Sequence, residues 1–149
     1  MTLAVSACLL GEMCRYDGAS KGCAEIMALG KEHTLIPFCP EAPVLGTPRG
    51  RISVIERDGV RRLLRDEDGM DVTDAIMAVT EAFIQSHPNI DRVILKSKSP
   101  SCGLGTTPML DEDKEMIGLG NGLAAEYLIE CGLQVWDENN FKKENECWK

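Results

Sequence analysis

Three cysteines of the chain stand where short apolar segments end, and thiols at such positions can ligate a metal or act as nucleophiles. Cys8 follows residues 2–7, Cys39 follows residues 34–38, and Cys102 lies a few positions beyond residues 91–96. A single cysteine at the end of a strand is more often a small buried hydrophobe. Because the carboxyl ends of parallel strands meet at one edge of a sheet, however, the sequence predicts that these three thiols lie together in a shared site.

The cysteine content favours metal binding or catalysis over disulfide formation. The chain has seven cysteines, a high number for a cytoplasmic protein, in which thiols stay reduced. It has no CxxC pair, and both histidines, His33 and His87, lie far from any cysteine cluster, which argues against a zinc finger. Three thiolates without histidine suit an iron–sulfur cluster or a cysteine-rich zinc site. Three protein ligands leave one metal position open for chemistry, which favours an enzyme.

The other four cysteines are weaker candidates for this site. Cys14 belongs to the same loop region as Cys8 and is either a fourth ligand or merely a neighbour. Cys23 and Cys131 fall within predicted helices and are expected to be packing residues. Cys147 lies near the C-terminus and is expected to have no role in the site.

Polar residues close to the three cysteines could take part in chemistry. Glu41, in the CPE segment, could transfer protons or activate water, although a solvated loop glutamate is an equal alternative. Ser99 and Ser101 could hydrogen-bond a ligand or a cluster sulfur, or could simply form a turn. Gly103 and Gly105 could present backbone N–H groups to an anion. The basic residues expected near this edge, which could offset thiolate charge, are Arg15, Arg49, Lys96 and Lys98.

Helical and strand patterns alternate along the chain, as in an α/β domain with a mainly parallel sheet. Helices are predicted from Ser20 to Leu29, from Asp71 to just before Pro88, and over residues 121–131, with a fourth strand over residues 133–136. The segments ISVIER and VRRLLR flank Asp58-Gly59, which predicts a β-hairpin that is either an insertion or a sheet edge. We therefore expect a single Rossmann-like α/β domain over residues 1–149, with helices on both faces of the sheet and a polar C-terminal tail from residue 137.

Composition limits the possible partners of the protein. A formal net charge of −8 argues against binding a nucleic-acid polymer, which requires a basic face. No signal peptide is recognisable and no segment approaches the roughly 20 apolar residues of a membrane helix, so a cytoplasmic location without membrane contact is expected. The expected ligand is a small molecule. A homodimer is compatible with the sequence.

Five segments of the chain together resemble a known protein family. In order, these are SACLLGEMCRYDG, FCPE, GTPRG, GMDVT and ILKSKSPSCG. They are similar to the family known as domain of unknown function 523, which includes the thiouracil desulfidases, and the similarity runs from about residue 5 to about residue 138.

The resemblance implies an iron–sulfur enzyme that removes sulfur without net redox change. Similar desulfidases hold a [4Fe-4S] cluster by three cysteines, whose counterparts here are Cys8, Cys39 and Cys102. The fourth iron binds the sulfur of a small thiouracil-like substrate, and water replaces that sulfur as sulfide is released. The acid–base residue corresponds to Glu41 and a supporting hydroxyl to Ser99, with Ser101 as a second candidate. Exposure to air is expected to remove such a cluster or let zinc replace it.

The residues also leave two other functions open. The first is a metal-binding or iron–sulfur module that senses or carries sulfur without catalysis, which ligation by four cysteines including Cys14 would favour. The second is thiol redox chemistry, which is less favoured because no CxxC pair supplies a resolving cysteine.

Overall fold

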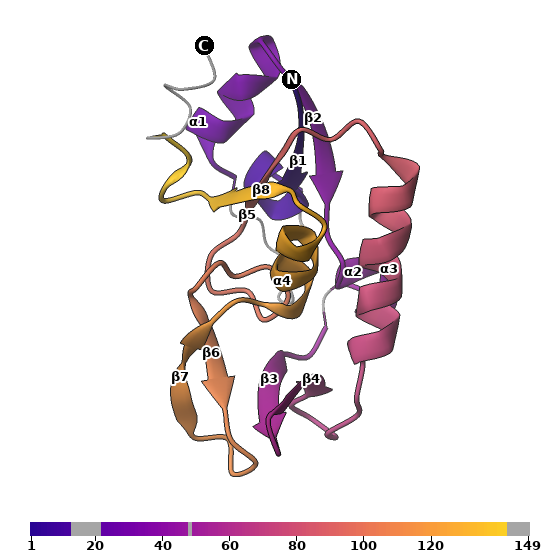
Figure 1. Ribbon diagram of the computed structural model, residues 1–149, viewed down its shortest axis with the longest axis vertical. Helices are drawn as coiled ribbons and strands as arrows, with labels where there is room; N and C mark the ends of the chain where they lie inside the picture. Colours follow the sequence, from indigo (N-terminus) through magenta and orange to yellow (C-terminus); the bar gives the residue numbers. More distant parts are fainter. Residues whose placement is uncertain (13–21, 48, 143–149) are drawn as a thin grey trace.

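The computed structural model describes residues 1–12, 22–47 and 49–142, and its centre is a parallel four-stranded sheet (Figure 1). The strands are β1 (Thr2–Ser6), β2 (Thr34–Phe38), β5 (Arg92–Leu95) and β8 (Gln134–Asp137), in the order β2-β1-β5-β8. Every neighbouring pair is parallel, so all four carboxyl ends lie along one edge. The prediction of a mainly parallel α/β sheet is confirmed.

The first strand is shorter than the sequence predicts. It ends at Ser6, and Ala7–Leu10 form a 3₁₀ turn, η1, which closes at Gly11 with a backbone φ of +92°. That left-handed conformation is one that glycine adopts without steric cost. Cys8 therefore lies within η1 rather than directly after a strand.

The predicted hairpin lies at the edge of a second sheet, which is one of the two alternatives that the sequence leaves open. Strands β3 (Ile52–Arg57) and β4 (Val60–Arg65) pair antiparallel around Asp58 and Gly59, both of which have positive φ, as a type I′ turn requires. The second sheet, in the order β4-β3-β6-β7, is completed by β6 (Thr107–Leu110) and β7 (Met116–Gly120). The sequence did not indicate these two strands, because Pro108, Gly118 and Gly120 interrupt the strand pattern.

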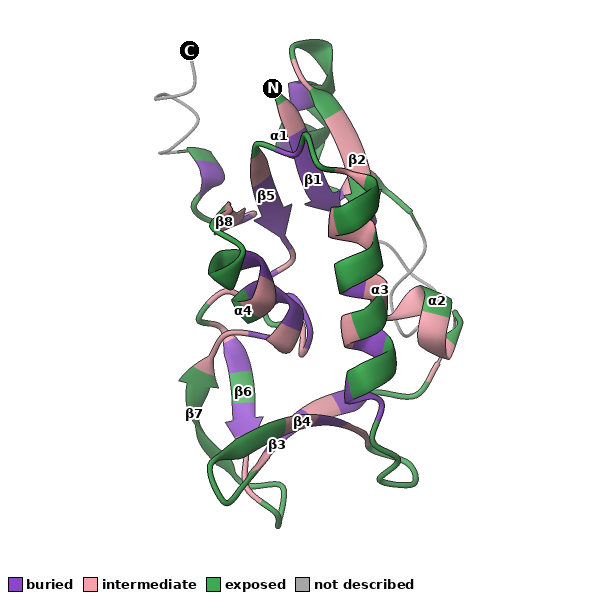
Figure 2. Ribbon diagram, turned by 45° about the vertical axis from the view of Figure 1, so that its right-hand side comes forward, coloured by how far each residue is buried: buried purple, intermediate pink, exposed green. Residues whose placement is uncertain are grey.

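Helices cover both faces of the parallel sheet, as predicted (Figure 2). Strand alternation sends Ala4 to one face and Leu3 and Val5 to the other. The first face packs against α3 (Thr73–Ser86) and α4 (Leu123–Glu130), and the second against η1 and α1 (Ala24–Met27). The predicted helix from Ser20 is observed only as α1 followed by the 3₁₀ turn η2 (Ala28–Lys31), while Ser20 itself lies outside the described residues.

Helix α3 connects the two sheets. Its C-terminal half places Phe83 and Ile84 against the parallel sheet, whereas Ile76 packs with Val54 and Leu63 of the second sheet. At the other end of the chain, the predicted polar tail begins inside β8 and carries Phe141 into the buried cluster around Leu3. No helix among the described residues is long and apolar enough to cross a membrane.

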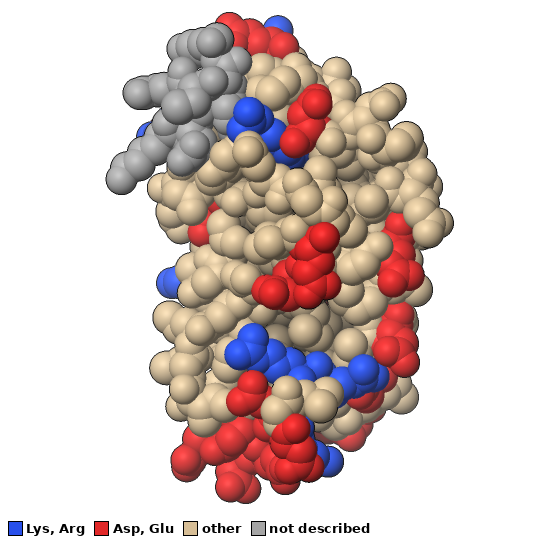
Figure 3. All heavy atoms as spheres, viewed as in Figure 1, with Lys and Arg blue, Asp and Glu red and all other residues tan. Residues whose placement is uncertain are grey.

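The charges on the molecule are unevenly distributed. On the face shown in Figure 3, acidic side chains gather at the lower end, where Figure 1 places the turn between β6 and β7. That turn carries Asp111, Glu112 and Asp113. Most of the lysines and arginines visible on this face lie above that end, and the most extended group of them forms a band just above it.

The loop that contains Cys102 is attached to the start of α4. The N–H groups at the start of a helix have no partner within the helix, and here the Ser101 carbonyl accepts two of them, from Ala124 at 2.9 Å and Ala125 at 3.1 Å. Gly122 donates its N–H to the Gly103 carbonyl at 2.7 Å. A Cβ at Gly122 would lie 2.4 Å from the carbonyl carbon and oxygen of Ser101, so only glycine permits this approach.

Gly122→Ala is therefore expected to displace the loop that carries Cys102 and to lower the free energy of unfolding by about 1–3 kcal/mol, the usual cost of overpacking. Urea unfolding followed by circular dichroism measures this change. Gly118→Ala is the matched control, because a Cβ there has no neighbour within 4 Å, and we expect it to change the stability by less than about 0.5 kcal/mol. Equal stability of the two variants would show that the loop tolerates the added methyl group.

Candidate functional site

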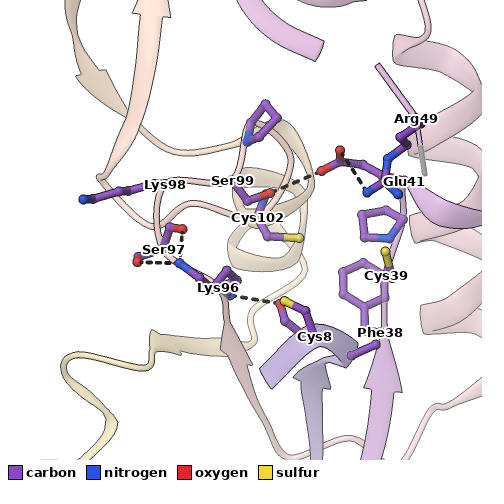
Figure 4. Close-up of a pocket in the computed structure, with 14 residues that line it drawn as sticks. Cys8, Phe38, Cys39, Glu41, Arg49, Lys96, Ser97, Lys98, Ser99 and Cys102 are labelled. Carbon is purple, nitrogen blue, oxygen red and sulfur yellow. Dashed lines mark hydrogen bonds and ion pairs between the residues drawn. The ribbon is translucent and has the colours of Figure 1, made fainter. Parts of the chain in front are cut away.

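The carboxyl edge of the parallel sheet holds a cavity of about 380 Å³, within the size range of small-molecule sites. Its wall contains Cys8, Cys39 and Cys102, each from a different segment of the chain. In Figure 4 the three sulfur atoms surround the same space. The structure thus brings together the three thiols that strand order and spacing single out.

Each cysteine is placed by a different local structure. Cys8 is buried in η1, and Cys39 directly follows β2, where its sulfur accepts the N–H of Ala42 at 3.4 Å. Cys102 lies in a turn after Pro100, and its N–H donates to the hydroxyl of Ser99 at 3.1 Å. The geometry therefore depends on strand ends and turns rather than on a single sequence motif.

Burial makes negative charge costly at Cys102. It raises the pKa of this thiol well above its ordinary value, and the nearby charges of Glu41, Cys39 and Cys8 raise the pKa further, against a smaller opposing hydrogen bond from Ser99. A deprotonated Cys102 therefore needs positive charge nearby. A cationic metal group would supply that charge and bind the deprotonated sulfurs.

The arrangement does not suit a single metal ion. Within residues 1–12, 22–47 and 49–142, no group of three or more His, Cys, Asp or Glu side chains could hold one. The cysteines of an iron–sulfur cubane each bind a different iron, so they surround the group instead of converging on one point. Three thiols around one cavity, without histidine, fit that second kind of group.

Glu41 and two serines join the CPE segment to the loop that carries Cys102. Ser101 donates its hydroxyl hydrogen bond to Glu41 Oε2 at 2.8 Å, and Ser99 Oγ lies 3.3 Å from the same oxygen. Arg49 Nη2 lies 3.6 Å from Glu41 Oε1. The three residues proposed for chemistry are thus in contact with one another. Ser99 lines the cavity, whereas Ser101 is fully buried and does not contribute to its wall.

Gly103 and Gly105 do not present their backbone N–H groups to an anion, contrary to the expectation from sequence. The N–H of Gly103 donates to the Ser99 carbonyl at 2.9 Å, and the N–H of Gly105 donates to Asn121 Oδ1 at 2.7 Å. Both donors are therefore used inside the protein. Gly103 is required instead for close packing, because a Cβ there would lie 2.0 Å from Thr107 Oγ1.

Three of the predicted basic residues, Arg49, Lys96 and Lys98, do line the cavity. Lys96 Nζ forms an ion pair with Glu138 Oε2 at 3.0 Å, and Glu138 Oε1 accepts the N–H of Ser97 at 2.7 Å. Glu138 is not among the residues predicted from sequence, although it follows β8 and so lies at the same strand edge as the cysteines. Phe38, which precedes Cys39 and lines the cavity, was not predicted either.

The remaining predicted site residues are placed differently or lie outside the description. Cys14, Arg15 and Cys147 are outside the described residues. Cys23 directly precedes α1 and packs against the buried cluster around Leu3, in line with a packing role. Cys131 follows α4 and is exposed, so its expected role in packing is wrong.

Comparisons with known proteins agree on the kind of protein this is. The family model for 2-thiouracil desulfurase matches residues 3–140. The uncharacterized protein YbbK of Bacillus subtilis (strain 168) is 35% identical over 146 residues, which cover 91% of this chain and 94% of YbbK. A solved structure of the [4Fe-4S]-dependent thiouracil desulfidase TudS is 33% identical, covers 95% of this chain and 93% of its own, and superposes with a TM-score of 0.77.

The environment of Cys102 predicts a low reactivity for its thiol in the metal-free chain. Because the thiolate is the reactive form and burial raises the pKa of Cys102, iodoacetamide should modify this residue at least tenfold more slowly, in round terms, than the exposed Cys131. Peptide mass spectrometry over a time course measures the two rates, with urea-unfolded protein as the control in which they should converge. Equal rates in the folded chain would contradict the effect of burial and of the acidic neighbours on Cys102.

Proposed function

Because the chain belongs to the 2-thiouracil desulfurase family, we propose that it removes sulfur from a small thiouracil-like compound and that Cys8, Cys39 and Cys102 hold a [4Fe-4S] cluster for this reaction. The observation that carries the proposal is the meeting of these three cysteines with Glu41 and Ser99 on the wall of one cavity. The similar protein TudS is a [4Fe-4S]-dependent thiouracil desulfidase.

The donor set supports a cluster with one iron free for substrate. Three thiols from three separate segments surround the cavity, and the described part of the chain offers no histidine to complete the set. When bound, the cluster would supply a soft Lewis acid that accepts sulfur and polarises the carbon–sulfur bond. The net reaction exchanges the thiocarbonyl sulfur for the oxygen of water, and the two protons of the water leave with the sulfide, so no electron donor is needed.

The chain's own residues would supply the proton transfer. Glu41 is a carboxylate on the cavity wall, which can accept a proton from water as the carbon–oxygen bond forms. Ser99 Oγ accepts the N–H of Cys102 and donates its single proton to Glu41 Oε2. Ser99 thus orients Glu41. The fully buried Ser101 holds Glu41 in place.

Removing a proposed ligand should remove the cluster. After anaerobic reconstitution, alanine variants of Cys8, Cys39 and Cys102 should each lose the visible absorption of the cluster and most of the bound iron and sulfide. Cys131→Ala is the matched control, because this exposed cysteine does not line the cavity, and it should retain wild-type content. Cys14→Ala should also retain the cluster. Its loss in that variant would instead support ligation by four cysteines and a binding module without catalysis.

Glu41→Gln should separate chemistry from cluster binding. The amide preserves the size of the side chain and its ability to hydrogen-bond the serines, but it cannot accept the proton. We therefore expect unchanged iron content and a fall in turnover of about 10²-fold or more, the scale of a lost general base. Sulfide release from a panel of thiolated pyrimidines, with the two proteins matched for iron, measures the effect. Full activity of the variant would exclude Glu41 as the base.

A further inference from the structure

The two carboxylate oxygens of Glu41 have different surroundings. Oε2 is the oxygen closest to the two serine hydroxyls, at 2.8 Å from Ser101 and 3.3 Å from Ser99. Oε1 faces Arg49 Nη2 at 3.6 Å, a separation typical of an ion pair and too long for a good hydrogen bond. No donor in the described part of the chain lies within hydrogen-bonding distance of Oε1. This oxygen can therefore accept a hydrogen bond from a molecule in the cavity.

Arg49 is anchored independently of Glu41. Its Nη1 donates to the Gly46 carbonyl at 2.9 Å and to Thr47 Oγ1 at 3.2 Å. Gly46 ends the short helix α2 (Ala42–Leu45) with a φ of +82°, a conformation that favours glycine. The guanidinium is thus held by the loop between α2 and β3.

The ion pair between these residues is almost completely removed from water. The side chain of Arg49 is 7% exposed and that of Glu41 is 12% exposed. A carboxylate in such a place is costly unless a cation or hydrogen bonds offset its charge. The exposed ion pairs of this protein, such as that of Arg57 with Glu112, have side chains 65% and 55% exposed and carry no such constraint.

We propose that Arg49 is a positioning residue for the desulfidase reaction: it fixes the plane of the Glu41 carboxylate so that Oε1 points into the cavity as the proton-accepting oxygen. The serines hold Oε2, and Arg49 restrains rotation of the carboxylate from the side of Oε1 without forming a hydrogen bond to that oxygen. Correct orientation of a base toward its water contributes directly to the rate. This inference rests on the proposed function, since it assigns a role within that same reaction.

The test compares reconstituted wild type, Arg49→Ala and Arg49→Lys, with Arg57→Ala as the matched control. We expect all four proteins to hold equal iron and sulfide. In Arg49→Ala, kcat should fall between about tenfold and 10²-fold while KM changes by less than about twofold, because orientation rather than substrate binding is lost. Arg49→Lys should also lose activity, since it keeps the charge but lacks the planar fork that reaches Gly46, Thr47 and Glu41 together.

Chemical rescue distinguishes positioning from a merely structural role. Millimolar guanidinium ion should restore part of kcat in Arg49→Ala, whereas potassium chloride at equal ionic strength should not. Arg57→Ala and Glu41→Gln should not respond to guanidinium. In addition, adding Arg49→Ala to Glu41→Gln should lower kcat no further, because two residues that act through one carboxylate are not additive.

Thermal unfolding of the same preparations gives a second, activity-independent measurement. The fall in Tm caused by Arg49→Ala should be smaller when Glu41 is already Gln, because no buried carboxylate is then left without its cation.

Sulfide release by wild type together with full activity of Arg49→Ala would overturn the inference alone. The inference would also be overturned if Arg49→Ala lost activity, guanidinium restored none of it, and the loss added to that of Glu41→Gln. Absence of sulfide release by wild type would overturn the proposed function and this inference with it.

Discussion

Three thiols and one carboxylate share a largely buried cavity, and the cost of placing negative charge there governs how the surrounding loops are built. Cys102 illustrates that cost, since burial and its acidic neighbours raise its pKa well above the ordinary value. Arg49 offsets the charge of Glu41 from one side. The two serine hydroxyls solvate the same carboxylate from the other side. A cationic iron–sulfur group would offset the charge of the thiolates in the same way.

The second sheet contributes to the site, although none of its residues lines the cavity. Thr107, the first residue of β6, donates its hydroxyl to the Ser99 carbonyl at 2.6 Å, and its neighbour Thr106 accepts the N–H of Lys98 at 2.8 Å. Lys98 has a φ of +66°, an uncommon conformation for a residue with a side chain. Together with the attachment to α4, these contacts fix the loop that carries Cys102. The parallel sheet supplies the edge that holds the cavity, and the second sheet stabilises the turn that carries Cys102.

Much of the fold could be read from sequence because local signals and burial agree. The apolar segments at residues 2–6, 34–38 and 92–95 pack on both faces, so they are continuous apolar runs, as expected of parallel strands. Asp58-Gly59 supplies the two positive φ values that its hairpin needs. Strands β6 and β7 were missed because they gain stability from pairing with β3 and with each other rather than from their own composition.

The sequence by itself determined which residues could do chemistry and that their strands would share one edge. Cys8, Cys39, Cys102, Glu41 and Ser99 follow from that rule, because strand order places the ends of parallel strands side by side. Only the tertiary structure decided which contacts the neighbouring residues make. It buried Ser101 behind Glu41, brought Arg49 to the other carboxylate oxygen, and occupied the N–H groups of Gly103 and Gly105 inside the protein. These outcomes depend on distances between segments remote in sequence, which residue type and spacing along the chain do not encode.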